Sequence, residues 1–161
     1  AGPVYLRRAI DLPGDAVLPW LHDRLAAEAA GVMAEFLDRW PWAEPEPQDE
    51  NQVTICRKLV HEDGHLDWTQ GAEAVERQVR AYTPAPGCWT RVGEDAYRIH
   101  AVARRGPLGL TPGQVRQQGR ELVVGCGCGD SLAILRLQPP GRTAMDVAAF
   151  LNGHPIPLRF G

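Results

Sequence analysis

The feature that most constrains the fold is a change of hydrophobic period after Gly87. From there on, apolar and polar residues alternate in five short segments separated by glycine-containing turns: CWTRV, AYRIHAVARR, GQVRQQ, ELVVGCGC and SLAILRLQ. A period of two is typical of strands with one buried face. Glycines inside the fourth segment suit a tightly curved strand. The pattern predicts a mostly β fold with flanking helices, built on a small closed β-barrel of the oligonucleotide-binding (OB) type.

Three other segments have helical periodicity. Apolar residues recur in steps of three or four over residues 18–40. They recur again over residues 70–81, where Thr69 is the expected N-cap and the apolar positions are Ala72, Val75, Val79 and Tyr82. A third, short helix is predicted over residues 144–151, capped by Thr143. We expect the second helix to pack on the barrel wall, with Trp68 anchoring its start.

The region before the predicted barrel reads as the end of another domain followed by a linker. Residues 4–8 (VYLRR) predict a strand, and with the long helix they form a βα unit that needs a sheet this sequence lacks. Proline and acidic residues then indicate an extended linker, with a short strand predicted over residues 53–59. The predicted parts are a βα remnant (1–42), an interdomain linker (43–62) and a helix plus barrel domain (63–161).

Composition indicates a folded protein outside the secretory pathway. The chain has 161 residues, 44% of them hydrophobic and 23% charged, which is ordinary for a globular protein. It has no apolar run of membrane-spanning length and no signal peptide. Its four cysteines lack a secreted disulfide framework, which favours a reduced, cytoplasmic protein. The first residues, Ala-Gly-Pro without Met, suggest a segment of a longer protein.

The charge is distributed unevenly along the chain. Residues 1–84 carry 8 basic and 15 acidic side chains, a net charge of −7, whereas residues 85–161 carry 9 basic and 5 acidic ones, a net charge of +4. All nine of those basic residues are arginine. A basic face of this kind is typical of a polyanion-binding surface. The alternative is that arginine is simply this protein's usual surface cation.

Two motifs suggest metal chemistry that their context does not favour. His61-Glu62-Asp63-Gly64-His65 matches the H-E-x-x-H zinc motif, but Asp63-Gly64 is a turn dipeptide and no apolar stripe indicates a helix. The sequence predicts a solvated turn there. Cys126 and Cys128 have no second cysteine pair nearby, so we interpret them as two small buried residues on a curved strand. No spacing of nucleophile, base or paired carboxylates indicates catalysis.

Several stretches of the sequence together resemble one protein family. RKL (57–59), EDGHLDW (62–68), RQVRAYTPAPGCWT (77–90) and FLNGHPI (150–156) resemble the back half of methionyl-tRNA formyltransferases. PQDENQVT (47–54) is similar to the interdomain segment of that family, and LHDRLA (21–26) to the last helix of its catalytic domain. The resemblance runs through nearly the whole chain in the right order.

The resemblance implies an upstream Rossmann-like domain that transfers a formyl group from 10-formyltetrahydrofolate to the amino group of methionyl-initiator tRNA. The family's catalytic residues are expected upstream of this chain. We therefore expect no catalytic residue, cofactor site or metal site within it, and no activity from the chain alone. The implied partners are the initiator methionyl-tRNA and the upstream formyltransferase domain, and the protein is expected to be a monomer without membrane contact.

The basic residues of the linker and barrel are the predicted tRNA contacts, because guanidinium groups pair bidentately with phosphate oxygens. They are Arg57, Lys58, Arg91, Arg98, Arg104, Arg105, Arg116, Arg120, Arg136 and Arg142. Two other functions stay open at this point. One is a related formyltransferase acting on a small amine, such as an amino sugar nucleotide or a hydroxyornithine. The other is a free-standing RNA-binding module.

Overall fold

The chain forms two compact units, one ending at Lys58 and the other spanning Leu59–Gly161. The computed structural model describes residues 2–161. Within that range no helix is both long enough and apolar enough to cross a lipid bilayer.

The first unit is built on one long helix, α1 (Leu18–Arg39), which confirms the predicted helix over residues 18–40. The strand predicted over residues 4–8 is wrong, because Val4 makes only an isolated bridge with Glu46. Residues 53–59 also form no strand. A β-branched segment becomes a strand only where a partner strand satisfies its backbone, and neither segment has one. The linker contains instead a short 3₁₀ turn, η1 (Glu50–Gln52).

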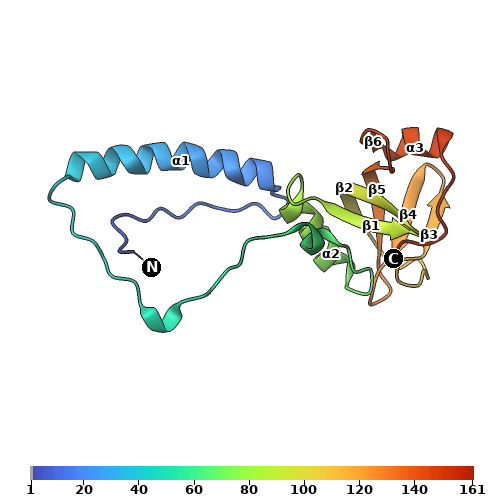
Figure 1. Cartoon of the computed structure of the whole chain (residues 1–161), viewed down its shortest axis with the longest axis horizontal. Coiled ribbons are helices and arrows are strands. Elements are labelled where there is room, and N and C mark those ends of the chain that lie inside the picture. The colour runs from blue at the N-terminus through green and yellow to red at the C-terminus, as the bar shows by residue number, and fades with distance from the viewer. Residues whose placement is uncertain (1) are drawn as a thin grey trace. The chain divides into compact units, whose positions relative to one another are not determined.

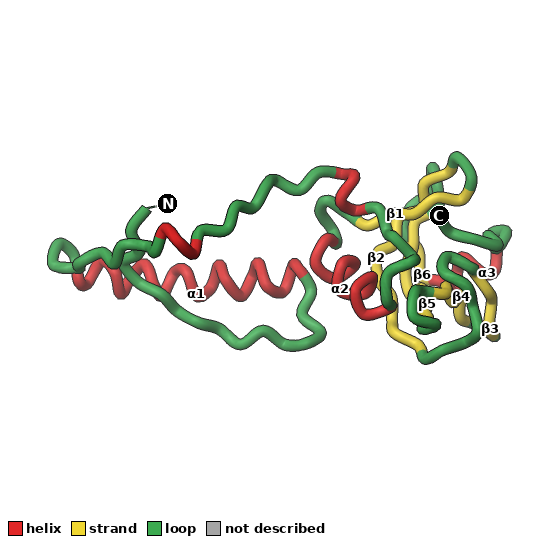
Figure 2. Tube along the Cα trace, turned by 90° about the horizontal axis from the view of Figure 1, so that it is seen from below, coloured by secondary structure: helices red, strands yellow, loops and turns green. Residues whose placement is uncertain are grey.

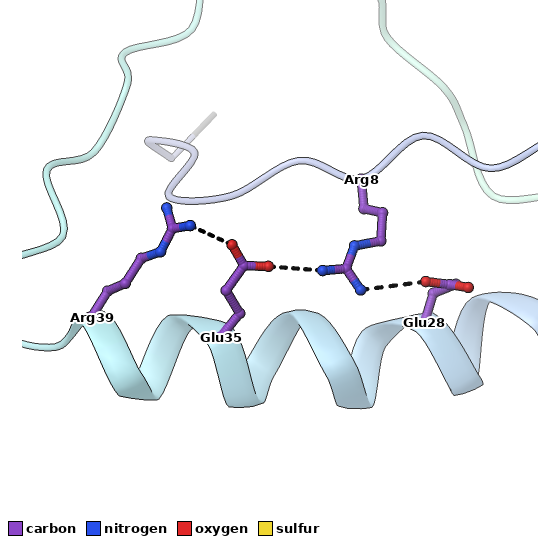
Figure 3. Close-up of polar contacts among 4 residues, drawn as sticks. All are labelled: Arg8, Glu28, Glu35 and Arg39. Atoms are coloured by element: carbon purple, nitrogen blue, oxygen red, sulfur yellow. Dashed lines mark hydrogen bonds and ion pairs between the residues drawn. The ribbon is translucent and has the colours of Figure 1, made fainter.

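Polar pairs connect the N-terminal segment to α1, as Figure 3 shows. The Arg8 guanidinium lies 2.7 Å from a carboxylate oxygen of Glu35 and 3.5 Å from one of Glu28. Tyr5 meets Phe36 edge to face, with ring centroids 5.2 Å apart. None of the residues of α1 is fully buried, and exposed ion pairs add little to stability.

We therefore expect α1 to open easily in this chain. Because it lacks buried apolar contacts, its amide protons should exchange through local opening, with protection factors at least roughly 100-fold below those of the buried strands. Hydrogen–deuterium exchange followed by mass spectrometry measures both regions in one experiment. Equal protection of α1 and the strands would contradict this expectation.

The second unit is an antiparallel sheet with strands in the order β1-β2-β5-β4-β3 (Figure 1). All five predicted strands are confirmed in position, although the fourth ends before Cys126. A sixth, two-residue strand that we had not predicted pairs with β5. The bounds are β1 (Cys88–Val92), β2 (Asp95–Arg105), β3 (Val115–Gln118), β4 (Glu121–Gly125), β5 (Ser131–Gln138) and β6 (Met145–Asp146).

The sheet is not closed, so the predicted closed barrel is not confirmed. Its two edge strands, β1 and β3, are instead bridged by the last residues of the chain. Gly161 exchanges backbone hydrogen bonds of 2.9 and 3.0 Å with Arg91 of β1. On the other side, the Val115 amide donates to the Leu158 carbonyl at 2.9 Å, at the start of β3. The extended segment 158–161 therefore hydrogen-bonds to both edge strands.

Helix α2 (Ala72–Tyr82) covers the core side of the sheet and confirms the predicted amphipathic helix. Ala72, Val75 and Val79 are buried, and Tyr82 packs against the same core. Trp68 is buried before the helix, and its indole N–H donates to the Thr90 hydroxyl at 2.9 Å.

Both predicted N-caps are wrong. Gly71 occupies the cap position of α2, since the Thr69 hydroxyl is 2.6 Å from the Asp67 carboxylate and is engaged there. The last helix, α3 (Val147–Gly153), begins later than predicted because Met145 and Asp146 are paired with β5 (Figure 2). Thr143 is therefore too far from α3 to cap it.

Candidate nucleic-acid interface

The alternation of side chains along β1 defines a surface on the side of the sheet away from the core. Cys88 and Thr90 are buried, so Trp89 and Arg91 point to the opposite face. Trp89 lies directly across from Arg98 of β2, which lies across from Gln138 of β5. Cross-strand partners share a face. We call this surface the outer face; its polar and aromatic residues are Trp89, Arg91, Arg98, His100, Arg136 and Gln138.

Two arginines of the outer face, Arg91 and Arg98, have no acidic partner among the described residues. Among residues 2–161, no carboxylate oxygen lies within 4.0 Å of the guanidinium nitrogens of Arg91 or Arg98. Arg91 instead lies 5.3 Å from the centroid of the Trp89 ring, a cation–π distance. Arg142 sits beside this face on the β5–β6 turn, where its carbonyl accepts a 2.7 Å bond from the Gln138 side chain. Arg136 differs, because its guanidinium lies 2.9 Å from a carboxylate oxygen of Asp146.

His100 lies partly buried between the arginines of this face. The register between β2 and β5 shifts at Ile99 and Ala101, which makes His100 the extra residue of a β-bulge. Its pKa is lowered by burial and by the nearby charges of Arg136 and Arg98, against an opposing hydrogen bond with Gln138. Its Nε2 atom is buried with no hydrogen-bond partner in the described part of the chain.

We expect Arg98→Ala to raise the pKa of His100 toward its ordinary value of 6.5, because one repelling charge is removed. The lowered pKa also affects the stability of the wild type. The His100 ring binds a proton more tightly in the unfolded chain than in the folded chain, so the free energy of unfolding should fall as the pH drops from 6.5 toward the lower folded pKa. An NMR titration of the His100 ring measures the pKa, and Arg120→Ala on the β3–β4 turn is the control. Titration of the wild-type ring at or above 6.5 would contradict the expectation.

The other predicted contacts lie elsewhere or are engaged by other groups. Arg105 and Arg116 also point away from the core, across from Ser131 and Val123, but on the far part of the sheet. Arg104 lies 3.8 Å from Glu73 of α2, and Arg105 pairs with Glu121 of β4. Arg116 donates to the Leu108 carbonyl at 2.7 Å, and Arg120 lies on the β3–β4 turn. Arg57 and Lys58 belong to the other unit. The structure therefore brings together Arg91, Arg98 and Arg136, with Arg142 beside them.

Sequence reasoning missed the partners of these arginines. Trp89, His100 and Gln138 were not predicted as site residues. Side chains alternate along a strand, and Cys88 and Thr90 are buried. This alternation would have predicted that Trp89 and Arg91 point together to the other face. The position of His100 depends on a bulge, which no local pattern in the sequence reveals.

The H-E-x-x-H segment forms a 3₁₀ turn, η2 (His61–Gly64), and packs against Trp89. The His61 ring stacks nearly parallel to the Trp89 ring, at 5.3 Å and 6°. His65 contacts the same ring at 4.5 Å, and its Nε2 lies 3.2 Å from the Gly161 carbonyl. The η2 turn therefore lies beside the outer face, in contact with Trp89. No three His, Cys, Asp or Glu side chains within residues 2–161 are grouped so as to hold a metal ion.

The interpretation of the C-x-C pair as two buried residues is wrong for Cys128. Because β4 ends at Gly125, the strand alternation does not continue, and Cys128 is exposed with a φ of 61°. Cys126 is buried, and burial, with the nearby Asp130, raises the pKa of its thiol to about 11. Burial raises the pKa of Cys88 to about 12. Neither buried thiol is a nucleophile near neutral pH.

Solved structures support this fold. HypX from Aquifex aeolicus matches 96% of this chain, and 30% of its own length, with a TM-score of 0.70 and 21% identity. A second HypX structure, in complex with tetrahydrofolic acid, matches 78% of this chain and 22% of its own length, with a TM-score of 0.60 and 22% identity. At this level of identity the likeness concerns the fold.

Sequence relatives extend the comparison over almost the whole chain. The methionyl-tRNA formyltransferase of Ruegeria pomeroyi is 38% identical over 157 residues, which are 97% of this chain and 50% of that protein. The methionyl-tRNA formyltransferase of Gluconobacter oxydans is 33% identical over 97% of this chain and 50% of its own length. The chain thus spans about half the length of these relatives.

The family match is centred on the second unit. The profile described as formyl transferase, C-terminal domain, matches residues 58–155, which include α2, all six strands and α3. Together with its similarity to methionyl-tRNA formyltransferases, this shows that the chain belongs to the formyl transferase C-terminal domain family.

Proposed function

We propose that this chain is the tRNA-holding part of a methionyl-tRNA formyltransferase, the enzyme that transfers formyl from 10-formyltetrahydrofolate to methionyl-initiator tRNA. The observation that carries the proposal is the outer face, where Arg91, Arg98 and Arg136 lie together with Arg142 beside them. The relatives that cover this chain are methionyl-tRNA formyltransferases. The residues that perform the formyl transfer lie in the upstream domain, and the role of this chain is to hold the tRNA.

Phosphate binding suits the residues present. Guanidinium groups donate paired hydrogen bonds to phosphate oxygens, and folded RNA is bound largely through its backbone and shape. Arg91 and Arg98 have no carboxylate partner among residues 2–161, so RNA binding would not have to break an ion pair there. Arg136 would exchange Asp146 for a phosphate.

The proposal is tested by titrating fluorescently labelled initiator tRNA with the purified chain at low salt. We expect saturable binding, and similar affinity for an elongator tRNA, because phosphate contacts carry no base identity. The chain incubated with formyl donor and methionyl-tRNA should give no turnover above a blank. Absence of tRNA binding at low salt would contradict the proposal and would favour a formyltransferase of a small amine, whose C-terminal domain need touch no nucleic acid.

A further inference from the structure

His61 carries an exposed ring next to the outer face that the phosphate contacts leave unused. Its side chain is exposed, while the Trp89 ring beneath it is half-buried. The two rings are almost parallel, so His61 extends the flat surface of Trp89 toward solvent.

The backbone of the η2 turn holds this ring in position. The Trp89 indole N–H donates to the His61 carbonyl at 3.0 Å, which fixes the turn to the strand. Gly64 at the end of the turn is buried against Gly87, where a Cβ would lie 1.9 Å from the Gly87 carbonyl oxygen. A ring held in this way loses little conformational freedom when a ligand stacks on it.

Cations that bind phosphate lie beside the stacked rings. Arg91 lies 5.3 Å from the Trp89 ring centroid, and Arg98 is the cross-strand neighbour of Trp89. A flat ring next to guanidinium groups is the combination that binds single-stranded nucleic acid, since bases stack on the ring while the backbone meets the cations.

We propose that the exposed face of His61 is a stacking site for an unpaired nucleobase of the bound RNA. This rests on the proposed function, because the flanking phosphates are those that the outer face holds. The base must be unpaired, since both faces of a base inside a duplex are already covered by its neighbours. Stacking is tolerant of base identity because every base has a flat face.

The test compares His61→Ala with His61→Phe, which keeps a flat ring but removes the imidazole nitrogens. The probe is a short single-stranded RNA, with a duplex RNA of the same length as the control. We expect His61→Ala to weaken binding of the single strand by roughly fivefold or more, whereas His61→Phe retains it. The salt dependence of both variants and the affinity for duplex RNA should match those of the wild type.

A second measurement needs no variant. Wild-type protein should quench the fluorescence of single-stranded RNA carrying 2-aminopurine, because that fluorescence falls when the base stacks on a ring. Salt-dependent RNA binding without quenching, and with His61→Ala equal to the wild type, would overturn the stacking site and leave the proposed function intact. Loss of binding in both His61→Ala and His61→Phe would also overturn it, since an imidazole nitrogen would then be required. No RNA binding by the wild type would overturn the proposed function and the stacking site together.

Discussion

Gly127→Ala is expected to destabilise the second unit by about 3 kcal/mol, because the added Cβ would clash with the backbone of a neighbouring segment. A Cβ at this position would lie 1.9 Å from the Thr69 carbonyl oxygen and 3.0 Å from that of Gln70. The Gly127 amide donates to the Trp68 and Gln70 carbonyls at 3.0 and 2.7 Å, so the two segments cannot separate without losing both bonds. The strain is therefore not relieved by a side-chain movement.

Gly71→Ala is the matched control. Gly71 is the bridge partner of Gly127, but a Cβ there would meet nothing within 4 Å, and its φ of −65° suits any residue. Its expected cost is within about 1 kcal/mol, because alanine is a poorer N-cap than glycine. Urea unfolding followed by tryptophan fluorescence gives both values. Equal stability of the two variants would show that the approach of Gly127 to Thr69 is not tight.

Replacing Arg91, Arg98 and Arg142 together by alanine is expected to weaken tRNA binding by roughly 30- to 300-fold at low salt, since three charge-assisted phosphate contacts are lost. The three side chains are exposed, and no carboxylate pairs with them among residues 2–161. Their removal should therefore leave the fold intact. The affinity is measured by fluorescence anisotropy with labelled initiator tRNA.

A charge-matched variant separates this local effect from the overall charge. Arg104, Arg105 and Arg120 are also arginines of the second unit, but the first two lie beside Glu73 and Glu121. Their replacement by alanine changes the formal charge equally, and we expect a loss of affinity of less than about fivefold. Equal losses in the two triple variants would mean that the arginines act through the net charge alone.

Local patterns predicted those elements that carry their own signal. In β1 and in the apolar stripe of α2 one face is buried, so period and burial agree. In β4 and β5 consecutive residues are buried, because Val123 and Ala133 pack with Leu110 away from the main core. The segments at residues 4–8 and 53–59 have the composition of strands but lack partner strands. Strand β6 forms because it pairs with β5, and residues 158–161 are held by hydrogen bonds to β1 and β3. Both segments are too short to show a recognisable period in the sequence.

The candidate site was predictable in its residue type and not in its geometry. An excess of arginine after residue 85 is visible in the sequence and points to the sheet as the candidate site. Which arginines share a surface depends on the strand register and on the bulge at His100. Which of them are neutralised depends on Glu73, Glu121 and Asp146, which come from three different elements. These relations exist only in the folded chain.

The salt dependence of tRNA affinity tests most directly whether the outer face binds phosphates. For the wild type we expect log affinity to fall linearly with log salt, with a slope of roughly −0.7 to −0.9 for each phosphate contacted. The variant lacking Arg91, Arg98 and Arg142 should show a slope smaller in magnitude by about two to three, whereas the Arg104, Arg105 and Arg120 variant should keep the wild-type slope. A shallow wild-type slope, or one that the outer-face substitutions leave unchanged, would contradict phosphate binding by this surface.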